Sequence, residues 1–252
     1  ALPKPACGDS FARLFMNEEA QKVWQEFKDE LRPNVSNASR HAIIDSQLSD
    51  VLAATPDSLV VIIGAGFDTR AFRIKGGKWI EVDEPPIISY KETVLPSAKA
   101  PNSLTRITID FARESLTEKL SPFKTPGTTH IIIEGVLMYL NHTDRQTLIT
   151  GLQTMFPNHI VYCDLMRKSF FERYSRNIHE KILSLGASFT DLSQHPEKLF
   201  LDNGYKTLSC SSIPLYASRH ANVGISSFLI RYFLKTLRTG YCIWRFEFLP
   251  KT

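Results

Sequence analysis

The chain has 252 residues, of which 43% are hydrophobic and 22% are charged, and its formal net charge is +4. A chain of this size and composition can bury a large core without disulfides or a structural metal, as a single α/β domain with additions does. Its basic residues are scattered rather than clustered, which argues against a nucleic-acid partner.

The cysteines and the apolar segments predict a cytoplasmic protein. Four cysteines are spread along the chain without a C-x-x-C pair, at Cys7, Cys163, Cys210 and Cys242. Such cysteines favour free, buried thiols in a reducing compartment, and we expect no metal site. The longest late apolar stretch, Phe228 to Leu234, is interrupted by Arg231 and is too short to span a bilayer, so we expect no membrane partner. The oligomeric state stays open.

Helical patterns dominate residues 1–55, which we expect to form a helical cap. From Phe11 to Leu31 the apolar residues recur at helical spacing. Pro33 and the polar run 34–39 predict a loop. A second helix is expected to open at Arg40 and to end before Pro56.

Between residues 56 and 165 the pattern changes to short apolar runs, separated by segments that are long enough for one helix each. Five such runs are predicted strands, at 59–63, 78–83, 104–110, 129–134 and 159–164. Short apolar strands that alternate with helices are typical of βαβ units. We therefore expect a Rossmann-like α/β fold with a parallel sheet and helices on both faces.

The last third of the chain is expected to complete the sheet. Residues 168–196 are amphipathic and polar, and they predict a helical insertion, or lid, within 166–200. A strand is expected at 205–213, and alternating aromatic and polar residues at 240–249 predict a final antiparallel strand. We expect one domain over residues 1–252, with its C-terminal strands in 201–252.

Ligands of such sheets bind outside the carboxyl ends of the strands, where the strand order reverses. The turn Gly64-Ala65-Gly66 follows the first predicted strand. The other four strands end in carboxylates, at Asp83, Asp110, Glu134 and Asp164. Four carboxylates along one edge would repel each other, and a ligand with hydroxyl and amine donors and a positive charge would offset the repulsion.

The glycines allow a sharp turn and a close approach of the backbone to a ligand. Gly64-x-Gly66 after a strand also fits a nicotinamide-dinucleotide site, but Thr69 stands where that fingerprint has its third glycine. A tight turn without a ligand is the structural alternative.

Two of the carboxylates have spacings that suit a nucleoside. Asp83 lies nineteen residues after Gly64, and a carboxylate there can accept both ribose hydroxyls; the alternative is a helix N-cap before Pro85. Asp110 could accept from an adenine amine while Phe111 packs on the base. The alternative is an N-cap beside a core phenylalanine.

The remaining candidates suit the amino-acid part of a ligand or the acceptor side. Glu134 could accept from an ammonium group, or could be a first-turn glutamate favoured by the helix dipole. Arg40 and Arg70 can bind a carboxylate bidentately, although Arg70 can instead pair with a strand-end carboxylate such as Asp83. Tyr139 is the candidate catalytic residue on the acceptor side, with a core tyrosine in an amphipathic helix as the alternative. No general base is apparent.

Three segments resemble motifs of the leucine carboxyl methyltransferase family of S-adenosylmethionine-dependent O-methyltransferases. They are the run from Val60 to Arg70, the run from Glu81 to Pro85 with Lys91 beyond it, and the run from Glu134 to Leu140. Few other Rossmann-like families carry both the Asp68-Thr69-Arg70 triplet after the glycines and the run from Glu134 to Tyr139.

The resemblance implies a seven-stranded class I methyltransferase sheet with an N-terminal helical cap, and S-adenosylmethionine as cofactor. Beside Ala65, Gly66 and Arg70, which are also predicted to contact the cofactor, it implies specific roles for six residues: Arg40 at the methionine carboxylate, Gly64 along the cofactor, Asp83 at the ribose, Asp110 and Phe111 at the adenine, and Glu134 near the methionyl end.

The family includes enzymes that methylate the C-terminal leucine of a protein phosphatase, a tRNA wybutosine branch and many bacterial O-methyltransferases, some of them in polyketide pathways. This chain is shorter than the phosphatase-directed members where substrate-binding segments would lie. The expected activity is therefore methyl transfer to a carboxylate or hydroxyl oxygen of a small molecule. An NAD(P)-dependent oxidoreductase, a carboxyl methyltransferase acting on a protein C-terminus and a non-catalytic binding protein are the alternatives.

Overall fold

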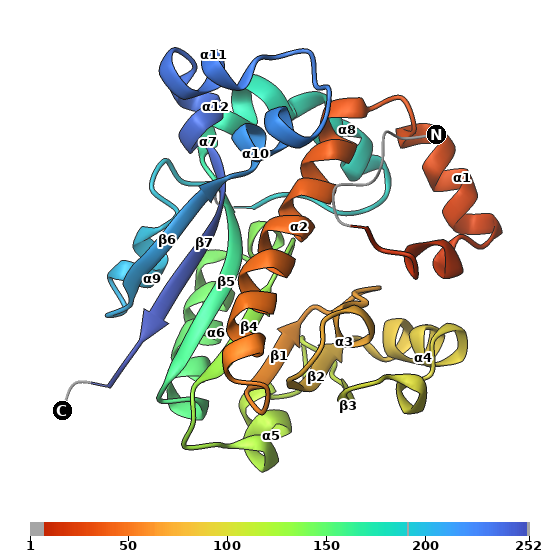
Figure 1. The fold of residues 1–252 in the computed structure, drawn as a ribbon, viewed down its shortest axis with the longest axis vertical. Coiled ribbons are helices and arrows are strands. Elements are labelled where there is room, and N and C mark those ends of the chain that lie inside the picture. Colours follow the sequence, from red (N-terminus) through yellow and green to blue (C-terminus); the bar gives the residue numbers. More distant parts are fainter. Residues whose placement is uncertain (1–7, 191, 251–252) are drawn as a thin grey trace.

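The computed structural model describes residues 8–190 and 192–250, and a seven-stranded sheet runs through their centre (Figure 1). The strand order is β3-β2-β1-β4-β5-β7-β6; β7 runs antiparallel to both β5 and β6, and the other neighbouring strands pair in parallel. The strands are β1 Leu59–Ile63, β2 Lys78–Asp83, β3 Ser103–Thr108, β4 Thr129–Ile133, β5 His159–Met166, β6 Lys206–Ser212 and β7 Tyr241–Phe248. The expected parallel sheet and its final antiparallel strand are both confirmed.

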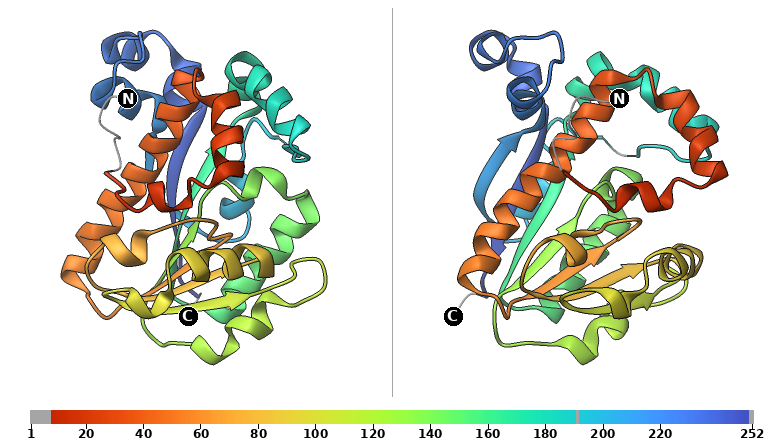
Figure 2. Two further views of the ribbon diagram at one scale, coloured as in Figure 1. Left: turned by 90° about the vertical axis from the view of Figure 1, so that its right-hand side faces the viewer. Right: turned by 45° about the vertical axis from the view of Figure 1, so that its right-hand side comes forward.

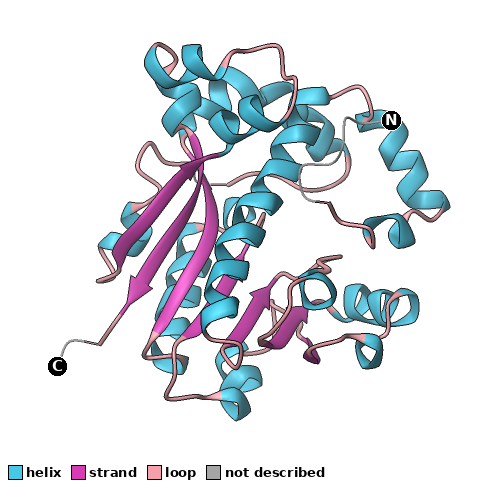
Figure 3. Ribbon diagram, viewed as in Figure 1, coloured by secondary structure: helices cyan, strands magenta, loops and turns pink. Residues whose placement is uncertain are grey.

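Helices cover both faces of the sheet and gather beyond one end of it (Figure 3). The α-helices are α1 Glu18–Phe27, α2 Leu31–Ala54, α3 Arg70–Arg73, α4 Pro85–Val94, α5 Leu116–Leu120, α6 His142–Met155, α7 Lys168–Phe170, α8 Arg176–Ser184, α9 Lys198–Leu201, α10 Ile213–His220, α11 Ser227–Tyr232 and α12 Lys235–Thr239. Short 3-10 turns lie at η1 Ala12–Phe15, η2 Ser97–Lys99, η3 Ser121–Phe123 and η4 Leu137–Tyr139, and η5 Phe171–Ser175 is a π-helical turn between α7 and α8.

Alternating side chains of the central strands feed two separate hydrophobic cores. Val60 and Ile62 of β1 pack with side chains of α2 and α10, such as Leu48 and Ile213. Val61 and Ile63 point to the other face, where α5, α6 and α9 contribute to the second core. Because both faces of β1 are buried, its sequence is apolar throughout, as expected of a central parallel strand.

The loop predicted at residues 34–39 is wrong, because α2 runs unbroken from Leu31 to Ala54. Pro33 lies in the first turn of α2, where the missing amide hydrogen would have no partner within the helix. The side chain of Asn34 donates to the carbonyl of Phe27, and Ser39 is fully buried. Tertiary contacts therefore stabilise a polar sequence as helix, and Arg40 lies inside α2 rather than at its start.

The second half of α2 belongs to the main body of the fold. Ile44, Leu48 and Leu52 are buried in the first core beside β1, so within the expected helical cap it is α1 and the start of α2 that stand away from the sheet (Figure 2). The other expected boundaries shift less. β3 ends at Thr108, two residues before Asp110, and β5 continues past Asp164 to Met166.

The insertion expected after the fifth strand is present as α7, η5 and α8. These helices gather with α10, α11, α12 and the start of α2 beyond the end of β5 (Figures 1 and 2). Within the described part of the chain, none of the helices combines the length and the hydrophobicity that a bilayer-spanning segment requires.

Candidate active site

The glycine turn after β1 has the backbone conformation that the sequence predicts. Gly64 and Gly66 have φ angles of +67° and +44°, in the left-handed region that favours glycine. A Cβ atom on Gly64 would lie 2.5 Å from Cγ2 of Val136, whereas a Cβ on Gly66 would meet nothing within 4 Å. Gly64 therefore permits close packing against the segment after β4, and Gly66 borders open space.

Asp83 at the end of β2 is bonded to this turn. The amide of Gly66 donates to Oδ2 of Asp83 at 2.5 Å, and the amide of Glu84 donates to Oδ1 at 2.7 Å. The N-cap of α4 is Glu84, without a side-chain cap, so Asp83 does not have the N-cap role that was the alternative. Each carboxylate oxygen of Asp83 keeps a lone pair that can accept from a ligand.

Asp110 lies beside Asp83 at the same sheet edge, since the amide of Ile109 donates to the carbonyl of Asp83. Oδ1 of Asp110 accepts from the amide of Ala112 at 3.0 Å, which stabilises the local turn. Phe111 is 44% exposed, so it is not the core phenylalanine that was the alternative.

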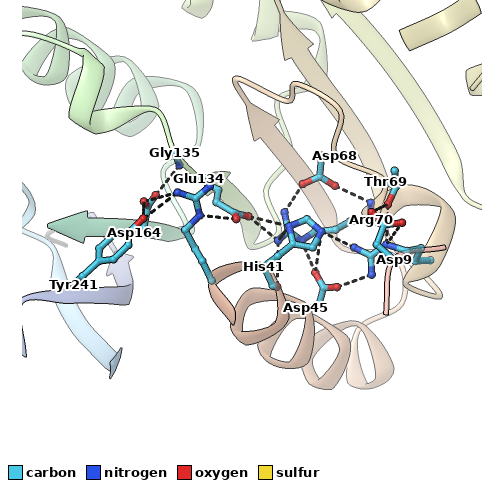
Figure 4. Close-up of polar contacts among 12 residues, drawn as sticks. Asp9, His41, Asp45, Asp68, Thr69, Arg70, Glu134, Gly135, Asp164 and Tyr241 are labelled. Carbon is cyan, nitrogen blue, oxygen red and sulfur yellow. Dashed lines mark hydrogen bonds and ion pairs between the residues drawn. The ribbon is translucent and has the colours of Figure 1, made fainter. Parts of the chain in front are cut away.

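Glu134, directly after β4, binds two arginines (Figure 4). Nε of Arg40 donates to Oε1 at 2.9 Å, and Nη2 of Arg70 donates to Oε2 at 2.7 Å. Burial alone would raise the pKa of Glu134, but Arg70 and Arg40 outweigh it and hold this pKa well below its usual range. Glu134 is therefore ionised at neutral pH, and the protein itself supplies the positive charge beside it.

Arg70 is the centre of a buried ion cluster and is fully inaccessible to solvent. Its guanidinium binds Asp45 of α2, Asp68 of the glycine loop and Glu134, and it also contacts His41 (Figure 4). It pairs with Glu134 rather than with Asp83, the partner that the sequence suggested. The ligand-binding role predicted for Arg70 has little support in this arrangement, because its three nitrogens already have protein partners.

The same cluster brings His41, Asp68 and Glu134 close enough together to suggest a cation site. The guanidinium of Arg70 contacts all three and lies where such a cation would bind. We assign no metal to this position.

Asp164 is buried inside β5 and does not end its strand. Its Oδ1 accepts from the amide of Gly135 at 2.6 Å. Its Oδ2 accepts from Nη1 of Arg40 at 3.1 Å and from the hydroxyl of Tyr241 at 2.8 Å. Arg40 and Arg70 together thus relieve most of the repulsion expected among the strand-end carboxylates, so a ligand is not needed to offset it at Glu134 and Asp164.

A cavity of about 300 Å³ lies beside Arg40, between the sheet edge and the helices beyond it, α7, α8, α10, α11 and α12. Most of its lining is apolar, including Met138, Phe170, Phe189 and Ile230. Its ionisable lining residues within the described chain are Arg32, Arg40, Tyr139, Tyr174 and Tyr241.

Tyr139 ends η4 at the edge of this cavity and is partly exposed, so it is not the core tyrosine of a helix that was the alternative. Its ring meets that of Phe189 edge-on, with 5.3 Å between the ring centroids. Burial raises the pKa of Tyr139, so its hydroxyl is protonated at neutral pH and can donate a hydrogen bond.

Several site residues were missed by the sequence interpretation. Asp45 binds both Arg70 and Arg73, and Tyr241 of β7 binds both Arg40 and Asp164. The spacing of His41 and Asp45 places them on one face of α2 and was a usable signal. Nothing in the sequence pairs Tyr241 with Arg40, which lies 201 residues away.

Comparison with proteins of known structure supports the class I methyltransferase fold. The magnesium protoporphyrin IX methyltransferase of Synechocystis PCC 6803, solved with bound S-adenosylhomocysteine, superposes with a TM-score of 0.55 at 14% identity, over 95% of this chain and 99% of that one. The plantazolicin methyltransferase, also solved with S-adenosylhomocysteine, gives a TM-score of 0.52 at 13% identity, over 95% and 94% of the two chains.

Sequence relatives include proteins of Mycobacterium and Mycolicibacterium. A protein of Mycobacterium tuberculosis H37Rv, named provisionally as an S-adenosyl-L-methionine-dependent methyltransferase, is 36% identical over 110 residues, or 41% of this chain and 36% of that protein. A similarly named protein of Mycolicibacterium paratuberculosis is 26% identical over 176 residues, or 60% and 54% of the two chains. The chain thus matches from about a third to half of the length of these relatives.

The family model described as leucine carboxyl methyltransferase matches residues 1–153, which include the glycine turn, Asp83 and Glu134. The chain belongs to the leucine carboxyl methyltransferase family.

Proposed function

We propose that this protein is an S-adenosylmethionine-dependent methyltransferase whose cofactor binds at the carboxyl ends of β1, β2 and β4. The observation that carries the proposal is the contact between Gly66 and Asp83. The turn leaves open space at Gly66 and fixes the Asp83 carboxylate beside it, as a ribose diol requires. The cofactor supplies a methyl group on a sulfonium, which is already activated for transfer.

The residues present fit the two ends of such a cofactor. Nη2 of Arg40 makes no hydrogen bond to any described residue, although Nε and Nη1 do, so it can bind a carboxylate. Oε1 of Glu134 accepts only from Arg40 among the described residues, which leaves it a lone pair for an ammonium. At the other end, the exposed ring of Phe111 beside Asp110 suits an adenine.

The acceptor is proposed to bind in the apolar cavity beside Arg40. A hydroxyl acceptor needs a base to remove its proton, whereas a carboxylate is already ionised at neutral pH. Among the described residues that line the cavity there is no histidine, lysine, cysteine or carboxylate, and its cations are Arg32 and Arg40. We therefore propose that the acceptor is the carboxylate of a small apolar molecule.

In this proposal the protein acts mainly by alignment. Holding the two reacting atoms in line can contribute roughly 7–11 kcal/mol toward the barrier. Arg40 lies on the wall between the cofactor edge and the cavity, and Glu134 and Asp164 fix its guanidinium from two strands. Tyr139 is placed to donate a hydrogen bond on the acceptor side.

The test is transfer of radiolabelled methyl groups from S-adenosylmethionine to a set of apolar carboxylic acids and the alcohols of the same carbon skeletons. We expect base-labile methyl esters of some acids and no labelled ether from the matching alcohols. The variant Asp83→Ala should give neither, while Asp57→Ala, which removes an exposed carboxylate elsewhere, should match the wild type. Labelled alcohols without labelled acids would contradict the proposed acceptor.

A further inference from the structure

The far end of the molecule, at α11, carries a cluster of exposed aromatic rings. Phe228, Tyr232 and Phe233 are 60%, 61% and 70% exposed, and Leu229 beside them is 46% exposed. The ring of Phe228 lies 4.9 Å from that of Tyr232 and 6.1 Å from that of Phe233, between centroids. These side chains therefore form one contiguous apolar surface, a kind of surface that marks interaction sites when it is left in water.

The chain around this cluster contains no acidic residue. From residue 203 to residue 246 there is no aspartate or glutamate, while six lysines and arginines give the segment a charge of +6. The whole chain carries only +4, so the remainder is net negative. Although the basic residues are scattered along the chain, the net charge is strongly asymmetric, because no acidic residue lies in residues 203–246.

Four of these cations are exposed on α10, α11 and α12, at Arg219, Arg231, Lys235 and Arg238. None of the four makes an ion pair with a described residue; the side chain of Arg238 donates to the carbonyl of Arg231. We call these four cations, with Phe228, Leu229, Tyr232 and Phe233, the α11 surface. Helix α11 lies at one end of the long axis of the molecule (Figure 1), and these side chains are exposed there.

The inner side of α11 faces the cavity that is proposed to bind the acceptor. Ile230 is buried and lines the cavity proposed for the acceptor, together with Ile225 before the helix and Leu237 of α12. Helices α10, α11 and α12 therefore separate this cavity from the α11 surface. Burying the rings in the cavity instead would require α11 to turn over, which would expose Ile230.

The combination of rings and cations selects among possible partners. A second copy bound through the same face would place cations against cations, with no acid in the segment to pair with them. A bilayer with anionic headgroups offers negative charge at its surface for the cations and an apolar layer directly beneath for the rings. We propose that the α11 surface binds anionic lipid membranes. It would lie on them without spanning, which revises the expectation from the sequence that the protein has no membrane partner.

Vesicle flotation of the full chain tests this proposal without any use of its methyltransferase activity. We expect the protein to float with vesicles of phosphatidylcholine and phosphatidylglycerol at low salt, and to stay behind with phosphatidylcholine alone or at high salt. The variant Phe228→Ser/Phe233→Ser should lose flotation. The variant Arg231→Gln/Lys235→Gln/Arg238→Gln should bind roughly 100-fold more weakly, because each base near the surface contributes about fivefold.

The controls change exposed apolar and basic residues elsewhere on the molecule. The variants Leu185→Ser/Leu208→Ser and Lys75→Gln/Lys78→Gln/Lys99→Gln should float as the wild type does, and circular dichroism melting should show that all variants are folded. The proposal is overturned if folded wild type stays out of anionic vesicles, or if the control variants lose as much binding. It is equally overturned if sedimentation shows a dimer that the phenylalanine variant breaks, or if a short DNA competes the protein off the vesicles.

Discussion

Arg40 of α2 and Glu134 after β4 are joined by a hydrogen bond of 2.9 Å between Nε and Oε1, across 94 residues of sequence. Nη1 of the same guanidinium reaches Asp164 in the neighbouring strand. These two contacts fix α2 to β4 and β5, the strands whose ends border the cavity. Arg40 is held in place before any ligand binds, so less side-chain conformational entropy is lost when a ligand binds to it.

Removing Arg40 should destabilise the fold through Asp164. In the variant Arg40→Met, Glu134 keeps Arg70, but the buried Asp164 keeps only Tyr241 and the amide of Gly135. Leaving a buried charge without its cation costs about 3 kcal/mol, to be measured by urea denaturation. The double variant Arg40→Met/Asp164→Asn should recover part of this loss.

The control for that experiment is Arg113→Met, since the side chain of Arg113 is 85% exposed and its pairing with Asp110 is long, at 3.5 Å. Its free energy of unfolding should stay within about 0.5 kcal/mol of the wild type. The interpretation of Arg40 is wrong if Arg40→Met is as stable as this control.

The two glycines of the turn should respond differently to alanine. Both variants carry the strain of a left-handed alanine, roughly 1–2 kcal/mol, but only Gly64→Ala also drives a Cβ into Val136. Thermal denaturation should therefore show a larger loss for Gly64→Ala. Gly66→Ala should stay folded and bind S-adenosylhomocysteine weakly, because its new methyl group enters the space proposed for the cofactor. Equal losses of stability, or normal binding by Gly66→Ala, would argue against this geometry.

Two buried histidines should make the fold sensitive to mild acid. Burial is the main factor that lowers the pKa of His130 and of His159 to about 4, from 6.5. Well above pH 6.5 both are neutral whether the chain is folded or not. As the pH falls below 6.5, the two histidines are protonated in the unfolded chain but stay neutral in the folded chain. The free energy of unfolding therefore falls until the pH reaches about 4.

The slope contributed by each histidine is at most about 1.4 kcal/mol per pH unit. Urea denaturation between these pH values should show a steeper fall for the wild type than for His130→Gln/His159→Gln. Parallel curves for the two proteins would show that these histidines do not cause the acid sensitivity.

Tyr139 should affect the acceptor and not the cofactor. Because its hydroxyl is protonated at neutral pH, Tyr139→Phe removes a hydrogen-bond donor without opening a void. We expect kcat/KM for a carboxylate acceptor to fall by roughly tenfold, with unchanged affinity for S-adenosylhomocysteine. Tyr232→Phe, on the α11 surface, should change neither. An affinity for S-adenosylhomocysteine that falls together with kcat/KM would move Tyr139 to the cofactor side.

The sheet was predictable from the sequence because its central strands are short and apolar on both faces. The range of β1 matches its apolar run, and the antiparallel β7 follows from alternating aromatic residues. The loop predicted at 34–39 is wrong because the polarity of a residue does not determine its exposure. Ser39 is fully buried in α2, and contacts with distant segments determine its environment.

The candidate site was predictable where residues act from strand ends and not where they meet through space. Gly66 and Asp83 follow adjacent strands, so spacing alone brings them together. Arg70 binds Asp45 and Glu134, which lie 25 and 64 residues away in the sequence, and only the packing of α2 on the sheet places them in contact. A motif arginine can therefore resemble a ligand-binding residue in sequence and be fully paired in the fold.

The most direct test of the central claim is isothermal titration of the full chain with S-adenosylhomocysteine, with Asp83→Ala and Asp57→Ala measured alongside it. The structure predicts saturable one-to-one binding by the wild type and by Asp57→Ala, binding weaker by at least about tenfold for Asp83→Ala, and no heat with NADH. One-to-one binding of NADH, or no heat from the wild type with either S-adenosylmethionine or S-adenosylhomocysteine, would contradict it.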